Sequence, residues 1–199
     1  MKKGQGLLET TIAISVLITG ITAVMGLTYS NASTTGKSSN RIIAANLARE
    51  AIEAVHFKRD TNWIQGLSYN SGLSSGTDYT FSTVLNPLTG SWILYFSPNA
   101  LSDSGSEVYS KTGLYLQTDT GSAPAGGNNS NFRRIVAANL ICRRNSNGSI
   151  TIRGSGSVCV PTGGARETEI GRQIIASVDW SEKSARQSFI VEDRIYDWR

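Results

Sequence analysis

One long apolar segment near the N-terminus constrains this chain more than any other feature. From Leu7 to Tyr29 nearly every residue is apolar or small, and the one acid among them is Glu9. As an α-helix rising about 1.5 Å per residue, this segment is long enough to cross the roughly 30 Å hydrocarbon core of a bilayer. A carboxylate inside a membrane span costs about 2.5–3.5 kcal/mol on insertion scales. We therefore expect a transmembrane helix in which Glu9 is retained to interact with a partner.

The residues before this segment place a small residue ahead of the apolar run. Lys2 and Lys3 are followed by Gly4, whereas an ordinary secretory signal has its small-residue cleavage site after the run. Cleavage after Gly4 would leave the hydrophobic helix on the mature chain. The lysines favour a cytoplasmic N-terminus and a C-terminal domain outside the membrane. The alternative interpretation is a plain single-pass anchor in which Glu9 lies close to the membrane surface and reaches the headgroups.

The order of basic pair, glycine, acid and apolar helix resembles the class III leader of type IV prepilins and type II secretion pseudopilins. In that family a prepilin peptidase cuts after the glycine. The resemblance implies processing between Gly4 and Gln5, methylation of the new N-terminus, and a subunit-assembly role for Glu9 opposite a neighbouring N-terminus. Gln5 departs from the Phe or Met that is usual in the family. The implied partners are other pilin or pseudopilin subunits, the peptidase, an assembly platform, an assembly ATPase and membrane lipid.

The same resemblance implies a structural protein rather than an enzyme. The segment from Asn46 to Val55 is similar to the minor-pilin branch, in which such a sequence ends the long helix. The implied location is the cytoplasmic membrane, followed by assembly into an extracellular or periplasmic filament. That filament would be a pilus (fimbrium), a protein-secretion pseudopilus or a DNA-uptake device, among which the sequence does not choose.

A second helical pattern follows the polar residues 30–36. Ile43, Leu47, Ala51 and Val55 recur every four residues, and the charged residues fall largely on the other side. An apolar stripe of this kind is buried against a globular domain of the same chain, although a linker helix beside an unrelated domain is the alternative. The predicted organisation is a leader at 1–4, a transmembrane helix at 5–30, an exported amphipathic helix at 31–62 and a β-rich domain at 63–199.

The β-rich part alternates Gly, Ser, Asn and Thr with short aromatic or β-branched runs. This alternation predicts an antiparallel sheet packed on the amphipathic helix, an α+β fold that is pilin-like. Asn147-Gly148 predicts a hairpin with a primed turn, and residues 181–185 predict a second hairpin. Residues 121–131 contain no core-forming side chain and are predicted to be a flexible loop. The predicted strands are 79–85, 92–96, 113–117, 133–142, 149–153, 173–181 and 187–196.

The chain has two cysteines, Cys142 and Cys159. In an exported domain only one pairing exists, and the disulfide would stabilise the fold by about 3 kcal/mol in the chain-entropy model. Two free buried thiols are the alternative. The sequence has no Cys/His cluster of zinc-binding spacing, so we expect no metal and no cofactor.

Catalytic motifs are not found, and the net charge of +4 is too mild to imply nucleic acid by itself. The single histidine, His56, is predicted to be a helix-terminal surface residue, and acids such as Glu167 and Glu169 resemble ordinary solvated charges.

A segment without acids carries five arginines. Neighbouring strand residues point to opposite faces, so we favour partner or subunit electrostatics over nucleic-acid phosphates. The alternative function is a membrane-tethered or pilus-tip module binding DNA or a surface through this region: Arg133, Arg134, Arg143, Arg144 and Arg153.

Overall fold

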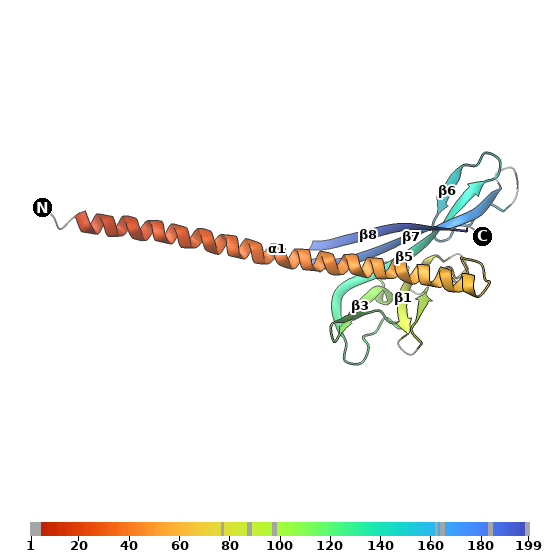
Figure 1. Cartoon of the computed structure of the whole chain (residues 1–199), viewed down its shortest axis with the longest axis horizontal. Coiled ribbons are helices and arrows are strands. Elements are labelled where there is room, and N and C mark those ends of the chain that lie inside the picture. The colour runs from red at the N-terminus through yellow and green to blue at the C-terminus, as the bar shows by residue number, and fades with distance from the viewer. Residues whose placement is uncertain are drawn as a thin grey trace. The chain divides into compact units, whose positions relative to one another are not determined.

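One α-helix, a short 3₁₀ turn and eight β-strands form within the residues that the computed structural model describes, which are 5–76, 78–86, 89–96, 99–161, 163, 166–182 and 185–197 (Figure 1). Their bounds are α1 Gln5–Ile64, β1 Thr80–Asn86, β2 Ser91–Tyr95, η1 Ser104–Ser106, β3 Glu107–Lys111, β4 Leu114–Leu116, β5 Asn128–Arg144, β6 Ile150–Arg153, β7 Glu167–Glu182 and β8 Ala185–Tyr196. The chain divides into two compact units, Met1–Arg41 and Ile42–Arg199, and α1 runs through both.

The described part of the first unit is helical throughout, including the polar residues 30–36. Its large apolar side chains are exposed, and the helix is long and apolar enough to span a membrane. Many of its threonine hydroxyls donate back to carbonyls one turn earlier, as Thr19 does to Ser15 (2.8 Å) and Thr28 to Val24 (2.9 Å). Hydroxyls paired in this way do not have to be hydrated, which suits a segment that enters lipid.

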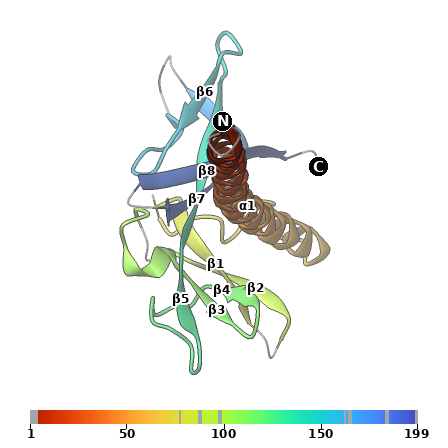
Figure 2. The ribbon, with the colours of Figure 1, turned by 90° about the vertical axis from the view of Figure 1, so that its left-hand side faces the viewer.

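Strand β5 is the centre of the antiparallel sheet in the second unit. Along one edge it pairs with β7 over almost its whole length, and β8 extends the sheet beyond β7. Along the other edge it pairs in turn with β3, β1 and β6, while β2 adds to β1 and β4 adds to β3. β5 therefore runs from the end where β3 and β4 lie to the end where β6 lies (Figure 2). The predicted α+β class is confirmed.

Alternate residues of the central strands face the second half of α1 and form the core. The helix contributes small side chains, Ala44, Ala48 and Ala51, together with Leu47 and Val55, so that it can lie close to the sheet. On β8 the inward side carries Phe189 and Val191, which the sequence pattern alone did not decide. The strand residues buried against the helix include Phe81, Phe132, Val136, Ala138, Ile174, Ala176, Val178, Trp180 and Ile195.

Two sequence predictions about this sheet are wrong. The loop predicted at 121–131 ends early, because Asn128–Asn131 already belong to β5, where Asn128 and Asn129 pair with β3. Strand β3 was not predicted, although Val108 and Tyr109 are buried in it. Its short run is bordered by polar residues, and it is a strand because β5 and β4 pair with it on both sides.

The two predicted hairpins form, but the primed turn lies elsewhere. Between β5 and β6 the chain turns through the four residues 145–148, and of its members Gly148 has a positive φ (72°). A two-residue primed turn instead joins β3 to β4, where Thr112 (φ 49°) and Gly113 (φ 83°) separate the paired Lys111 and Leu114. The last hairpin joins β7 to β8 with Glu182 opposite Ala185.

Candidate functional site

The predicted processing and assembly residues lie at the start of α1. Gly4 and the rest of the predicted leader lie outside the described residues, whereas Gln5 is the first residue of the helix. Glu9 is exposed one turn further on, among exposed leucine and isoleucine side chains. The helix therefore presents one carboxylate on an otherwise apolar surface, with nothing in the described part of this first unit covering it.

Arg134 is buried, although it was predicted as a candidate contact to nucleic acid. Its side chain is 2% exposed and joins the sheet to the second half of α1. The guanidinium donates to Gln117 Oε1 (2.8 Å), Leu47 O (3.0 Å), Glu50 Oε1 (3.1 Å) and Thr83 O (3.1 Å). Burial lowers the pKa of Arg134, and the carboxylate of Glu50 offsets part of that effect. This arginine is a structural link between helix and strands.

Two more arginines of the cluster are engaged within the domain. Arg133 pairs with Glu107 (3.0 Å) across the β5–β3 ladder and donates to two carbonyls of the 99–106 segment. Arg153 makes a bidentate pair with Glu167, at 2.9 Å for each bond. Arg143 is exposed, and Arg144 is half-buried. The five arginines therefore do not gather into one exposed surface.

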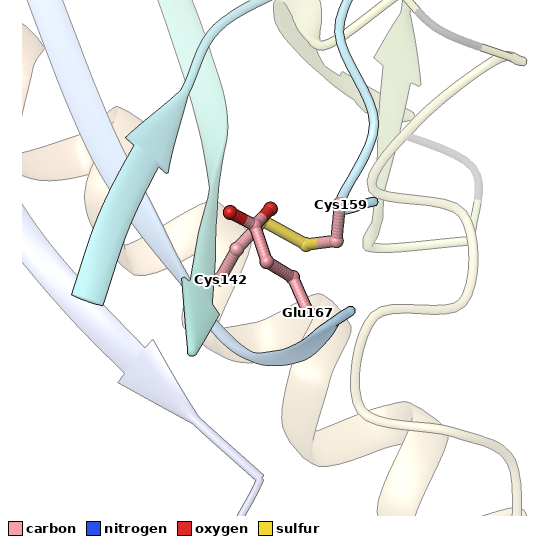
Figure 3. A group of neighbouring side chains, drawn as sticks. All are labelled: Cys142, Cys159 and Glu167. Atoms are coloured by element: carbon pink, nitrogen blue, oxygen red, sulfur yellow. A yellow bond between two sulfur atoms is a disulfide. The ribbon is translucent and has the colours of Figure 1, made fainter. Parts of the chain in front are cut away.

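The acid at the disulfide end of the domain, Glu167, was predicted to be a solvated charge and is instead buried. Cys142 on β5 is bonded to Cys159, with Cα atoms 5.6 Å apart, so the predicted pairing is confirmed (Figure 3). Glu167 lies beside the bridge with its side chain 1% exposed, and it is not a solvated charge. The two sulfurs and this carboxylate lie within 4.8 Å of one another. Because the sulfurs are bonded to each other and the acid to Arg153, the group is a structural joint.

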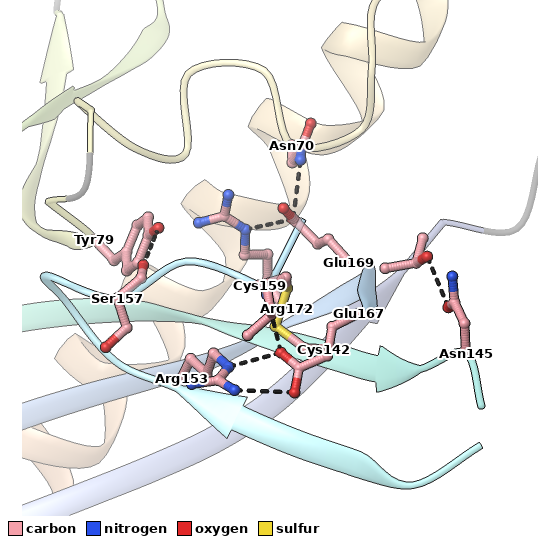
Figure 4. Close-up of a disulfide and its surroundings, with 12 residues drawn as sticks. Asn70, Tyr79, Cys142, Asn145, Arg153, Ser157, Cys159, Glu167, Glu169 and Arg172 are labelled. Atoms are coloured by element: carbon pink, nitrogen blue, oxygen red, sulfur yellow. Dashed lines mark hydrogen bonds and ion pairs between the residues drawn. A yellow bond between two sulfur atoms is a disulfide. The ribbon is translucent and has the colours of Figure 1, made fainter. Parts of the chain in front are cut away.

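Glu169 is the other acid that the sequence did not single out. Its Oε1 accepts from Asn70 (2.9 Å) and Arg172 (2.8 Å), which Figure 4 shows. The hydroxyl of Tyr69 donates to the same oxygen at 2.9 Å. Burial, followed by the charge of Glu169, raises the pKa of Tyr69. These hydrogen bonds connect the segment after α1 to strand β7. Patterns within a few residues could not reveal the whole group, because Tyr69 and Asn70 lie 100 and 99 positions from Glu169.

His56 is also engaged across the fold. Its Nε2 bonds to Asp193 Oδ2 on β8, on the face of the sheet that meets the helix. Burial raises the pKa of Asp193, but the bonds from His56 and from the Arg194 amide outweigh it and hold this pKa below its usual value. The pair joins the second half of α1 to strand β8.

The Cys142–Cys159 bridge is expected to contribute strongly to stability. Replacing both cysteines with Ser should lower the free energy of unfolding by about 3 kcal/mol, because the bridge closes a loop over a separation of 17 residues. Urea unfolding of the full chain in detergent, followed by tryptophan fluorescence, measures this change. Reduced and alkylated wild type should match the double variant, and a loss below about 1 kcal/mol would contradict the expectation.

Glu167 should make the domain sensitive to acid. The Arg153 and Val160 donors hold its pKa below the usual value, against the opposing effect of burial. A carboxylate with a lowered folded-state pKa stabilises the fold above its unfolded pKa of about 4.3 and loses that contribution as pH falls through the folded value. The Tm of wild type should therefore drop more steeply than that of Glu167→Gln between about pH 5 and pH 3. Glu53→Gln, at an exposed acid, should keep the wild-type slope; equal slopes for all three proteins would refute the assignment.

Comparison with known proteins found no relative. No protein-family model matches the chain, and neither does any curated protein or solved structure.

Proposed function

We propose that this chain is a structural subunit of a type IV pilus-like or type II secretion-like filament, of the minor-pilin or pseudopilin kind. In this proposal the chain is cleaved after Gly4 and is anchored in the cytoplasmic membrane with its C-terminal domain outside. It then joins the filament through α1. Neighbouring subunits, a prepilin peptidase and an assembly platform are its partners.

The observation that carries the proposal is the contrast between the two halves of α1. The first half has exposed apolar side chains on every side and one acid, Glu9, whereas the second half buries an alanine-rich stripe in its own domain. A membrane anchor needs the apolar surface but not the acid. A helix that packs among other helices uses both, because an isolated carboxylate in that environment is stable only beside a positive group.

The alternative, a module that binds nucleic acid through its arginines, receives less support. Such a surface needs several exposed guanidinium groups on one face. Arg133, Arg134 and Arg153 are instead bonded to acids and carbonyls inside the domain. We therefore favour the structural role.

Processing of the N-terminus tests the proposal. When the full chain is co-expressed with a prepilin peptidase, intact mass spectrometry of the purified protein should show loss of Met1 to Gly4 and a new terminus at Gln5. Gly4→Val should block the cut, whereas Gly6→Val, a matched glycine change just beyond it, should be cut normally. An unchanged mass, or a cut at any other bond, would remove the basis for the family assignment.

A further inference from the structure

Two basic side chains, Lys37 and Arg41, lie on α1 shortly after the apolar segment that ends at Tyr29. Both are exposed, and neither has an ion pair or a side-chain hydrogen bond within the described residues. In the second unit, by contrast, arginines such as Arg134 and Arg153 are bonded to acids. The part of the chain that the structure describes therefore leaves the charges of Lys37 and Arg41 to be balanced by something outside it.

The acids of the same helix are too distant to neutralise these cations. No acid occurs in the sequence between Glu9 and Glu50. Along the helix, Lys37 lies about 42 Å from Glu9, and Arg41 lies about 14 Å from Glu50. Exposed charges further apart than the Debye length of about 8 Å are largely screened from each other. Glu50 is in addition already bonded to Arg134.

The position of this pair along α1 suits the headgroup layer of a bilayer. When the apolar segment fills the hydrocarbon core up to Tyr29, the Cα atoms of Lys37 and Arg41 lie about 12 and 18 Å beyond its edge. Residues 30–36 are helical, so the rise is uniform across them. Side chains on a helix lean toward its N-terminus, which here is toward the lipid, and long basic side chains reach the headgroups. Lys37 therefore reaches the phosphate layer, and Arg41 lies about one turn further out.

Small side chains lie below the two cations on the same face of α1. The residues of this face follow each other at intervals of three or four: Gly26, Ser30, Thr34, Lys37 and Arg41. The Thr34 hydroxyl donates to the Ser30 carbonyl (3.0 Å), so it needs no partner in the lipid. The small side chains leave room for the glycerol and the upper part of an acyl chain to lie against the helix. Ser30 adds a hydroxyl that can donate to a phosphate or ester oxygen.

We propose that Lys37 and Arg41 bind an anionic phospholipid, of the phosphatidylglycerol kind, in the leaflet on the C-terminal side of the span. The ammonium of Lys37 contacts the phosphate, and the guanidinium of Arg41 lies over the headgroup. A zwitterionic headgroup would bring its own cation close to this pair and be repelled by it. An acidic protein segment would have to enter a layer that lipid phosphates already occupy. The inference rests on the proposed membrane anchoring, but not on cleavage, orientation or filament assembly.

Native mass spectrometry of lipids retained by the full chain tests the inference. The chain is released from nanodiscs that contain equal amounts of phosphatidylglycerol and phosphatidylcholine with the same acyl chains. The parent protein carries Lys2→Gln and Lys3→Gln, because these lysines would attract the same anionic lipid at the other end of the span. One basic residue near an anionic surface strengthens binding about fivefold. We therefore expect the parent to retain phosphatidylglycerol at least about fivefold over phosphatidylcholine, and the added pair Lys37→Gln and Arg41→Gln to lower this ratio below about twofold.

A matched pair of changes and a flotation assay complete the test. Arg49→Gln with Arg143→Gln removes two exposed cations from the second unit and should keep the lipid ratio of the parent. Every variant should float with vesicles of phosphatidylcholine alone, because the apolar span is unchanged. If the chain floats, the lipid site is overturned by a parent ratio near one, by no change with Lys37→Gln and Arg41→Gln, or by an equal fall in the matched pair. A chain that does not float would overturn the membrane anchoring together with the lipid site.

Discussion

Replacing Arg134 with Ala is expected to lower the free energy of unfolding by about 3 kcal/mol or more. The change removes a buried side chain that satisfies Gln117 Oε1 and the carbonyls of Leu47 and Thr83. Glu50 is partly exposed and can be hydrated afterwards, so most of the cost comes from the buried acceptors and from the void. Urea unfolding of the full chain in micelles measures this loss.

Two matched changes separate this role from a general effect of charge. Arg143→Ala removes an exposed arginine from the same strand and should change stability by less than about 0.5 kcal/mol. Glu50→Gln keeps a neutral acceptor for Arg134 and should cost less than Arg134→Ala. If Arg134→Ala and Arg143→Ala have the same stability, the link between helix and sheet is not what holds the domain together.

The second large effect follows from the proposed filament role, and it is expected from Glu9→Ala in cells that assemble such a filament. Membrane insertion should persist, because the change makes the span more apolar. Incorporation into filaments should fall at least tenfold, since one lost charge pair in lipid exceeds the roughly 1.4 kcal/mol that a factor of ten represents. Immunoblotting of sheared filaments against the membrane fraction measures the ratio.

Glu53→Ala is the matched control for this experiment. It removes an exposed acid from the second half of the same helix and should leave incorporation unchanged. Normal incorporation of Glu9→Ala would exclude the pairing role of the acid. Loss with both variants would indicate a general need for negative charge on α1.

The long helix and the class of fold could be predicted because their signals are local. Apolar side chains four residues apart and short β-branched runs reflect which face of each element is buried, and the structure agrees with both. Strand β3 was missed because its identity depends on its neighbours: the run Glu107–Lys111 has two buried apolar residues and is a strand through pairing with β4 and β5. The position of the primed turn was likewise set by the register of β3 and β4, which no dipeptide reveals.

The bonding of the charged residues could not be predicted for a related reason. Arg134 and Glu50 lie 84 positions apart, and His56 and Asp193 lie 137 apart. The alternation of side chains along a strand indicated that neighbouring arginines would point apart. Nothing in the sequence indicated that Arg134 would be the one enclosed, or that Glu167 would be buried beside the disulfide.

The position of β5 in the sheet has a consequence for how the newly made chain acquires its structure. Strands β1 to β4 precede β5, yet β1 and β3 each have one edge that pairs with β5, and β7 must follow before the other edge of β5 is covered. Contacts this distant along the chain are slow to form, typically within milliseconds to seconds. The β1–β2 and β3–β4 hairpins can pair locally during synthesis, but the edges of β1 and β3 that bond to β5 should remain unpaired until β5 has emerged. A nascent fragment that stops before β5 would therefore expose two unpaired strand edges and depend on chaperones.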